Sequence, residues 1–153
     1  MNIRRVKLSE QEALLGWIRE YFTYDGISFD EKLIAPGLDL MLRDPHVGWA
    51  WFVEVPAENC ATPQIVGYAI ATPGFDLEFG GRRATLTDLY LSPSHRRRGL
   101  GSLVLAAIEA ECRNEGCLAI ELQVENDNRE AQGLYRKSGF VPHDRLPMSK
   151  RWV

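Results

Sequence analysis

The sequence predicts a single α/β domain built around a mixed β-sheet. Three observations lead to this prediction. The chain has 153 residues, a length at which one domain buries roughly 68–70% of its unfolded surface. Apolar residues follow strand and helix periodicities in the order strand, two helices, three strands, helix, strand, helix and final short strands. Hydrophobic content of 45% and charged content of 25% are ordinary for a soluble globular protein.

The amino-terminal third is expected to form one short strand and two helices. The strand covers residues 3–6. Ser9 and Glu12 have the spacing of a capping box at the start of the first helix. Asp30 is expected to cap the second helix, because its carboxylate can accept a bond from a free backbone N–H. Pro36 is expected to interrupt or restart that helix, because proline lacks the N–H that helical bonding needs.

Three strands are expected in the middle of the chain. Residues 49–55, 65–72 and 85–91 are rich in aromatic, β-branched and other apolar residues. Turn-rich stretches over 56–63 and 73–81 are expected to connect them, because prolines bound the first and glycine and proline occur together in the second.

A basic, glycine-containing loop follows the third of these strands. It reads Arg96-Arg97-Arg98-Gly99-Leu100-Gly101, and apolar residues then recur at helical spacing over 100–114. The first N–H groups of a helix have no internal partner and carry partial positive charge. Glycines let a ligand approach the backbone closely, and the arginines add full charges. The loop therefore predicts a phosphate or pyrophosphate site.

Two other phosphate-binding motifs do not fit this loop. A P-loop would need a lysine directly after Gly101, and serine stands there. The dinucleotide fingerprint would need a small residue at Val104, where the side chain is branched. The alternative without a ligand is a basic surface loop that caps the following helix.

A second informative stretch lies near the carboxyl end. Residues 118–124 alternate as a strand, residues 125–128 form a polar turn, and residues 129–137 read as a short helix. Val141 and residues 148–153 are expected to supply final short strands.

Together, the two stretches resemble the Gcn5-related N-acetyltransferases, the GNAT family. The pattern Arg96-x-x-Gly99-x-Gly101 resembles the family's pyrophosphate loop. Six later positions fall where the family carries N-x-x-A-x-x-L-Y-x-x-x-G-F; they are Asn128, Ala131, Leu134, Tyr135, Gly139 and Phe140. The resemblance covers about 84–141. It implies one N-acetyltransferase domain over 1–153, with a mixed, mostly antiparallel sheet, splayed central strands and flanking helices.

The resemblance also implies that acetyl-coenzyme A (acetyl-CoA) is the acetyl donor. In the family, main-chain groups near the end of the strand before the loop pair with pantetheine, and an N–H there polarises the thioester carbonyl. Asn128 is expected to contact the pantetheine or phosphate portion, and it can cap the next helix as well. The residues expected to bind the cofactor are Leu89, Tyr90, Leu91, Arg96, Arg97, Arg98, Gly99, Leu100, Gly101, Ser102, Asn128 and Tyr135.

Two side chains are expected to move protons in the reaction. In family members with a tyrosine at the position of Tyr135, this phenol is the usual acid for the leaving thiolate. Its ordinary pKa near ~10 keeps it protonated at neutral pH. Asp88 is expected to deprotonate the amine, with Glu78 or water as alternative bases. The structural alternatives are a packed aromatic ring at Tyr135 and a hydrogen-bonded carboxylate at Asp88.

The acceptor is expected to be an amine, on a small molecule rather than on a protein. Tyr24, Asp25, Phe29 and Glu78 are expected to line its pocket, because carboxylates and aromatic rings both attract a cation. A polyamine-like molecule, an amino acid, an aminoglycoside and a protein lysine all fit this description. The alternative function is a non-catalytic acyl-CoA-binding module, which would need neither Tyr135 nor Asp88.

Composition argues against several other classes of protein. The net charge of −3 gives no general attraction for nucleic acid, and the apolar runs are too short to span a membrane. Cys60, Cys112 and Cys117 are odd in number and lack a C-x-x-C pair, so neither a disulfide framework nor a metal site is predicted. A reducing cytoplasm fits best. A homodimer is one assembly that the sequence allows.

Overall fold

The computed structural model describes residues 1–57 and 61–152. They form two compact units: unit 1 over residues 1–123 and unit 2 over residues 124–153. Cys60 and the middle of the expected connection over 56–63 lie outside the described residues.

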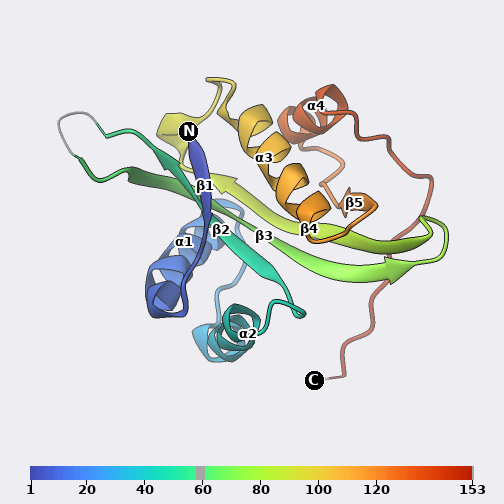
Figure 1. Cartoon of the computed structure of the whole chain (residues 1–153), viewed down its shortest axis with the longest axis horizontal. Helices are drawn as coiled ribbons and strands as arrows, with labels where there is room; N and C mark the ends of the chain where they lie inside the picture. Colours follow the sequence, from blue (N-terminus) through green and yellow to red (C-terminus); the bar gives the residue numbers. More distant parts are fainter. Residues whose placement is uncertain (58–60, 153) are drawn as a thin grey trace. The chain divides into compact units, whose positions relative to one another are not determined.

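The sheet of unit 1 has five strands, which pair in chain order from β1 to β5 (Figure 1). Neighbours from β1 to β4 run antiparallel, whereas β4 and β5 run parallel. The expected mixed, mostly antiparallel sheet is therefore confirmed. The strands are β1 (Asn2–Arg5), β2 (Trp49–Val55), β3 (Gln64–Asp76), β4 (Gly81–Leu91) and β5 (Ala119–Leu122).

Helices cover both faces of this sheet. In unit 1, α1 (Gln11–Tyr24) and α2 (Glu31–Arg43) pack on one face, and α3 (Leu100–Asn114) lies on the other (Figure 1). The chain passes through α3 between β4 and β5, because parallel neighbours need a long crossover. Unit 2 contains α4 (Arg129–Lys137). Over 1–57 and 61–152, no helix is long and apolar enough to cross a membrane.

The core on the α1–α2 face decides where the site can form. Successive residues of a strand point to opposite faces, so β2 sends Ala50 and Phe52 to α1 and α2 but Trp49 and Trp51 to the other side. Each large apolar side chain that is fully buried contributes about 1.5–3 kcal/mol. The larger residues buried on the α1–α2 face are Leu14, Leu15, Ile18, Leu38, Met41, Phe52, Tyr68, Ile70 and Tyr90.

The start of α1 differs from the expectation. The capping box of Ser9 and Glu12 is wrong, because a 3-10 turn at Leu8–Glu10 comes before the helix. The carboxylate of Glu10 accepts a hydrogen bond from the Lys7 N–H at 3.0 Å. The side-chain cap therefore lies two residues earlier in the chain than the sequence pattern indicates.

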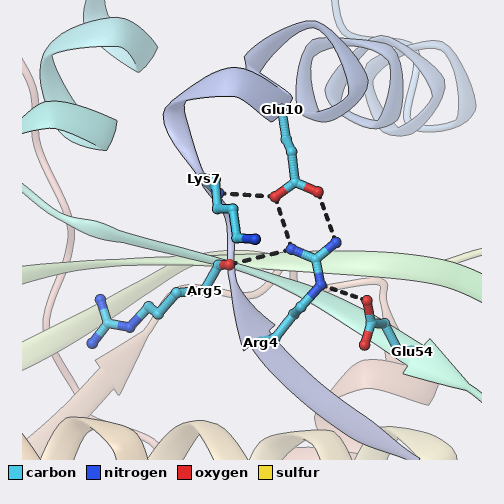
Figure 2. A network of polar contacts seen from close by, with 5 residues as sticks. All are labelled: Arg4, Arg5, Lys7, Glu10 and Glu54. Atoms are coloured by element: carbon cyan, nitrogen blue, oxygen red, sulfur yellow. Dashed lines mark hydrogen bonds and ion pairs between the residues drawn. The ribbon is translucent and has the colours of Figure 1, made fainter. Parts of the chain in front are cut away.

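An arginine connects this cap to the sheet. Arg4 on β1 donates to both carboxylate oxygens of Glu10 at 2.7 Å and to Glu54 on β2 at 2.6 Å (Figure 2). The hydrogen bond from Arg4 holds the pKa of Glu10 down to about 2. Glu54 is buried, so Arg4 supplies the countercharge that its carboxylate needs.

The second helix begins as expected but continues where a break was predicted. Asp30 caps α2, since its side chain accepts the N–H of Lys32 at 3.0 Å. Pro36 lies inside the continuous helix, so the expected interruption is wrong. Proline removes only one helical hydrogen bond there, and burial of Leu38 and Met41 against the sheet keeps the following turns in place.

The hairpin of β3 and β4 is longer than expected. β3 continues to Asp76 and β4 begins at Gly81, so the predicted connection over 73–81 is mostly strand. Pro73 pairs with Ala84 of β4. The β2 ladder ends before this position, so the missing N–H of Pro73 breaks no pairing on that side.

The expected final strands are absent from the described residues. Residues 138–152 contain no strand, so the predictions at Val141 and over 148–152 are wrong. The side chains of Val141, Leu146 and Met148 are exposed. Apolar residues alone do not specify a strand when no neighbouring strand pairs with them.

Candidate active site

The two strands on either side of α3, β4 and the edge strand β5, pair along only part of their length. β4 pairs with β5 only from Arg83 to Leu86. A register shift against β3 follows, in which Leu86 pairs with Ala71 and Asp88 with Ile70. Residues 87–91 therefore have no strand partner on the β5 side among the described residues. This confirms the expected splay and leaves a free strand edge beside Asp88.

Asp88 follows the bulge that this register shift creates. Its side chain is half-buried, and burial raises its pKa to about 6. Over the described residues its carboxylate has no hydrogen-bond partner. A carboxylate that is ionised near neutral pH and unpaired within the fold is suited to accept a proton.

The carboxylate of Asp88 lines a hollow of about 190 Å³ on the α1–α2 face. From α1 the hollow is lined by Ile18 and Phe22, and from the sheet by Ile70. The α2 side is formed by Ile34, Gly37, Leu38 and Met41. The hollow is therefore an apolar space with one acidic group.

Tyr68 of β3 places a second polar group on this face. It pairs with Tyr90, and this pair lies two residues along the strands from the pair of Ile70 and Asp88, on the same face of the sheet. Its side chain is fully buried, and its hydroxyl has no hydrogen-bond partner over 1–57 and 61–152. Burial raises the pKa of Tyr68, and the charge of Asp88 adds to the effect. Its unmet hydrogen bond was not predicted from the sequence.

The basic loop has the backbone geometry that an anion site needs. Arg97 (φ 60°) and Gly99 (φ 74°) both have left-handed conformations directly before α3. The N–H groups of Gly99, Leu100, Gly101 and Ser102 have no acceptor in the described part of the chain. These free donors and the positive end of α3 can bind a pyrophosphate. Arg98 is exposed at the same loop.

Arg96 has a different local role from its two neighbours. Its Nε donates to the carbonyl oxygen of Leu91 at 2.8 Å. Its guanidinium carbon lies 4.2 Å from the ring centre of Tyr24 and 5.1 Å from that of Tyr90. The Tyr90 hydroxyl in turn donates to Glu20 of α1 at 3.0 Å. Arg96 thus fixes the start of the loop against the end of β4 and the end of α1.

Unit 2 carries the other two expected site residues. Asn128 caps α4, because its Oδ1 accepts the N–H of Ala131 at 3.0 Å. Tyr135 lies within α4 and packs edge-on against Phe140, with 5.7 Å between ring centres. Burial raises the pKa of Tyr135, so its phenol stays protonated at neutral pH and can donate.

The residues expected to line the acceptor pocket have different surroundings. Tyr24 stacks on Arg96, and Phe29 packs against Phe22, with 6.0 Å between ring centres. Glu78 lies in the turn of the β3–β4 hairpin, about 20 Å along the strands from Asp88 at ~3.3 Å per residue. The structure therefore does not bring Glu78 and Asp88 together.

The sequence analysis missed most of the residues around the hollow. Ile18 and Phe22 have i, i+4 spacing, as do Ile34 and Leu38. This spacing marks each as part of an apolar helix face. It does not tell which apolar residues are covered by the sheet and which line an open space.

Comparisons with known proteins agree with this geometry. The model of the acetyltransferase (GNAT) family matches residues 11–140. The thialysine N-epsilon-acetyltransferase of Bos taurus is 28% identical over 141 residues, covering 90% of this chain and 82% of that protein. The uncharacterised N-acetyltransferase YhfO of Bacillus subtilis is 26% identical over 140 residues, covering 92% of this chain and 89% of that protein.

Solved structures share the fold. An integron cassette protein from the mobile metagenome of Cole Harbour Salt Marsh has a TM-score of 0.82 at 23% identity, covering 99% of this chain and 90% of that chain. AAC(6')-Iy, in complex with the bisubstrate analogue CoA-S-monomethyl-acetylneamine, has a TM-score of 0.79 at 18% identity, covering 99% and 98%. The family match extends over most of the sequence, and the chain therefore belongs to the acetyltransferase (GNAT) family and is an N-acetyltransferase that uses acetyl-CoA.

Proposed function

We propose that residues 1–153 act as one domain that transfers the acetyl group of acetyl-CoA to a primary amine on a small molecule. The observation that carries this proposal is the position of Asp88, which lies in an apolar hollow next to the unpaired edge of β4. The family match across 11–140, which spans parts of both units, supports one domain.

The loop at the start of α3 is proposed to hold the cofactor. Its free N–H groups would bind the pyrophosphate, and Arg98 would add a full positive charge. The unpaired edge over 87–91 would offer main-chain groups to the amides of pantetheine. Asn128 is proposed to contact the cofactor in addition to capping α4.

Asp88 and Tyr135 are proposed to move the two protons of the reaction. Asp88 accepts a proton from the ammonium group, directly or through water, so that the amine nitrogen has a free electron pair. The nitrogen then forms a bond to the thioester carbon, and the carbon–sulfur bond breaks. Tyr135 donates its phenolic proton to the departing thiolate, and the nitrogen, positively charged once bonded to the carbon, releases its second proton through water to the Tyr135 phenolate. General acid and base steps of this kind contribute about 10²–10⁴-fold to a rate.

The names of similar proteins support a small amine as the acceptor. The Bos taurus relative is named for thialysine, and AAC(6')-Iy is an aminoglycoside N-acetyltransferase. Both names describe an amine on a small molecule, and we extend only this shared feature to the present chain. A homodimer and a cytoplasmic location stay predictions.

An amine panel with acetyl-CoA tests the proposal. Thiol release should require both the enzyme and an amine, and mass spectrometry should find the acetylated amine. Free CoA at about 100 times its Kd should raise the free energy of unfolding by about 2.7 kcal/mol. Stabilisation by CoA without acetylation of any amine would favour the non-catalytic binding module.

A further inference from the structure

The chemistry of the hollow beside Asp88 restricts the amines that fit it. The space measures about 190 Å³, and a water-sized group occupies about 30 Å³. It therefore holds about six non-hydrogen atoms. Apart from Asp88, the described residues around it are apolar side chains and one glycine. A substrate arm in this space gains from burying carbon and sulfur atoms, whereas a second charged group would lose its water without a partner.

The acidic residues of α2 are paired with arginines and do not line the hollow. Glu31 forms an ion pair with Arg19, and Asp39 forms one with Arg43 at 2.8 Å. Within the hollow itself, Asp88 is the one charged group among the described lining residues. The hollow can therefore neutralise one ammonium group but not two.

Gly37 is a position at which a substitution can change the size of the hollow. It lines the hollow, is exposed to solvent, and lies on α2. A Cβ atom built at Gly37 meets no atom within 4 Å. The first atom of a side chain placed there therefore enters open space. Gly16 on α1 has the same freedom, is also exposed, and does not line the hollow.

We infer that the acceptor is a monoamine whose amino group is carried on an uncharged apolar arm of about six non-hydrogen atoms, and that the hollow binds this arm. This inference rests on the proposed function, because it takes Asp88 as the group that meets the amine. Molecules with several ammonium groups, such as polyamines and aminoglycosides, are then poor acceptors.

A series of straight-chain alkylamines tests the inference. From ethylamine to hexylamine, kcat/KM should rise by about fourfold for each added methylene and should level off once the hollow is full. A diamine as long as hexylamine should be poorer than hexylamine by about 10²-fold, because its second ammonium group would be buried without a partner. A flat series, or a preference for diamines or aminoglycosides, would overturn the inference while the acetyltransferase function stands.

Gly37→Leu tests whether the hollow is the place that binds the alkyl arm of the amine. The new side chain should cut the ratio of kcat/KM for hexylamine to that for ethylamine by at least about tenfold. Gly16→Leu, the matched control, should keep the wild-type ratio. Gly37→Ala should lower the ratio by about fourfold, and it remains informative if the leucine variant does not fold. An unchanged ratio in folded Gly37 variants would mean that the arm binds elsewhere. Failure of the wild type to acetylate any amine would reject the proposed function itself.

Discussion

The guanidinium group of Arg96 lies over the ring of Tyr24, 4.2 Å from its centre, while its Nε is bonded to the carbonyl oxygen of Leu91. This contact joins the basic loop over 96–101 to the end of α1, a helix that also forms one side of the hollow beside Asp88. Arg96 thus contacts the same helix, α1, that lines the proposed acceptor hollow, so α1 connects this hollow to the proposed cofactor loop.

Tyr24→Leu should weaken CoA binding without unfolding the protein. The Tyr24 ring is 59% exposed, and a cation–π contact at such a site is worth about 0.5–1 kcal/mol. The Kd for CoA should therefore rise by about two- to fivefold in a calorimetric titration. Tyr24→Phe keeps the ring and should bind CoA as the wild type does. Equal affinities for the wild type and the leucine variant would show that Leu91 and Tyr90 hold Arg96 without help from Tyr24.

Gly99→Val should weaken CoA binding more than Arg98→Ala does. Gly99 has a φ of 74°, and a β-branched residue in this conformation costs about 1–3 kcal/mol. The strain should displace the free N–H groups of the loop, whereas Arg98→Ala removes one exposed charge. Titration of both variants with CoA checks the order. The reverse order would mean that side-chain charge, not the backbone, dominates binding.

Asp88→Asn should lower the transfer rate at neutral pH by about 10²-fold, the contribution of a positioned base. In the wild type the pKa of Asp88 is about 6, so kcat/KM should rise as the pH increases through 6. The variant should lack this rise and should recover part of its rate at high pH, where free amine is abundant. Rate profiles from about pH 5 to 10 test this. An equal loss at every pH would indicate a structural role.

The same substitution should change stability in the opposite direction. Because the pKa of Asp88 is raised in the folded state, the wild type loses stability as the pH rises from about 4, the unfolded pKa, to about 6. Asparagine carries no charge to bury, so the melting temperature of Asp88→Asn should exceed that of the wild type at pH 7. At pH 4 the two proteins should melt closer together. A less stable variant at pH 7 would show that the carboxylate has a partner.

Tyr68→Phe should stabilise the fold by about 1 kcal/mol, because the buried hydroxyl of Tyr68 has no hydrogen-bond partner among the described residues. Urea unfolding measures the change. If the hydroxyl serves a bound amine or an ordered water near Asp88, kcat/KM should fall by about two- to tenfold at the same time. A destabilised variant would reveal a hydrogen bond that Tyr68 makes within the fold.

Tyr135→Phe should reduce turnover by about 10²–10⁴-fold with little change in the Kd for CoA. The substitution keeps the ring that packs on Phe140, so the melting temperature should stay close to that of the wild type. Single-turnover kinetics on protein of known folded fraction separate these effects. Near-normal transfer by the folded variant would assign the proton donation to water or to another hydroxyl.

The sequence by itself determined the elements whose signals are local. The strand at Trp49–Val55, the start of α3 and the full extent of α4 follow from side-chain periodicity and from capping residues within the same segment. The prediction of a phosphate site over 96–101 uses signals of the same kind, since the first N–H groups of a helix and the glycines lie next to each other in the chain, and it stays a prediction.

Only the tertiary structure decided the features that depend on distant segments. Pro73 lies in a strand because β2 ends before reaching it, and Val141 lies in none because no strand pairs with it. The hollow needs Phe22, Gly37 and Asp88 from two helices and the sheet. Periodicity tells which face of an element is apolar, but the space left between two faces depends on how their side chains pack, and no single segment encodes this.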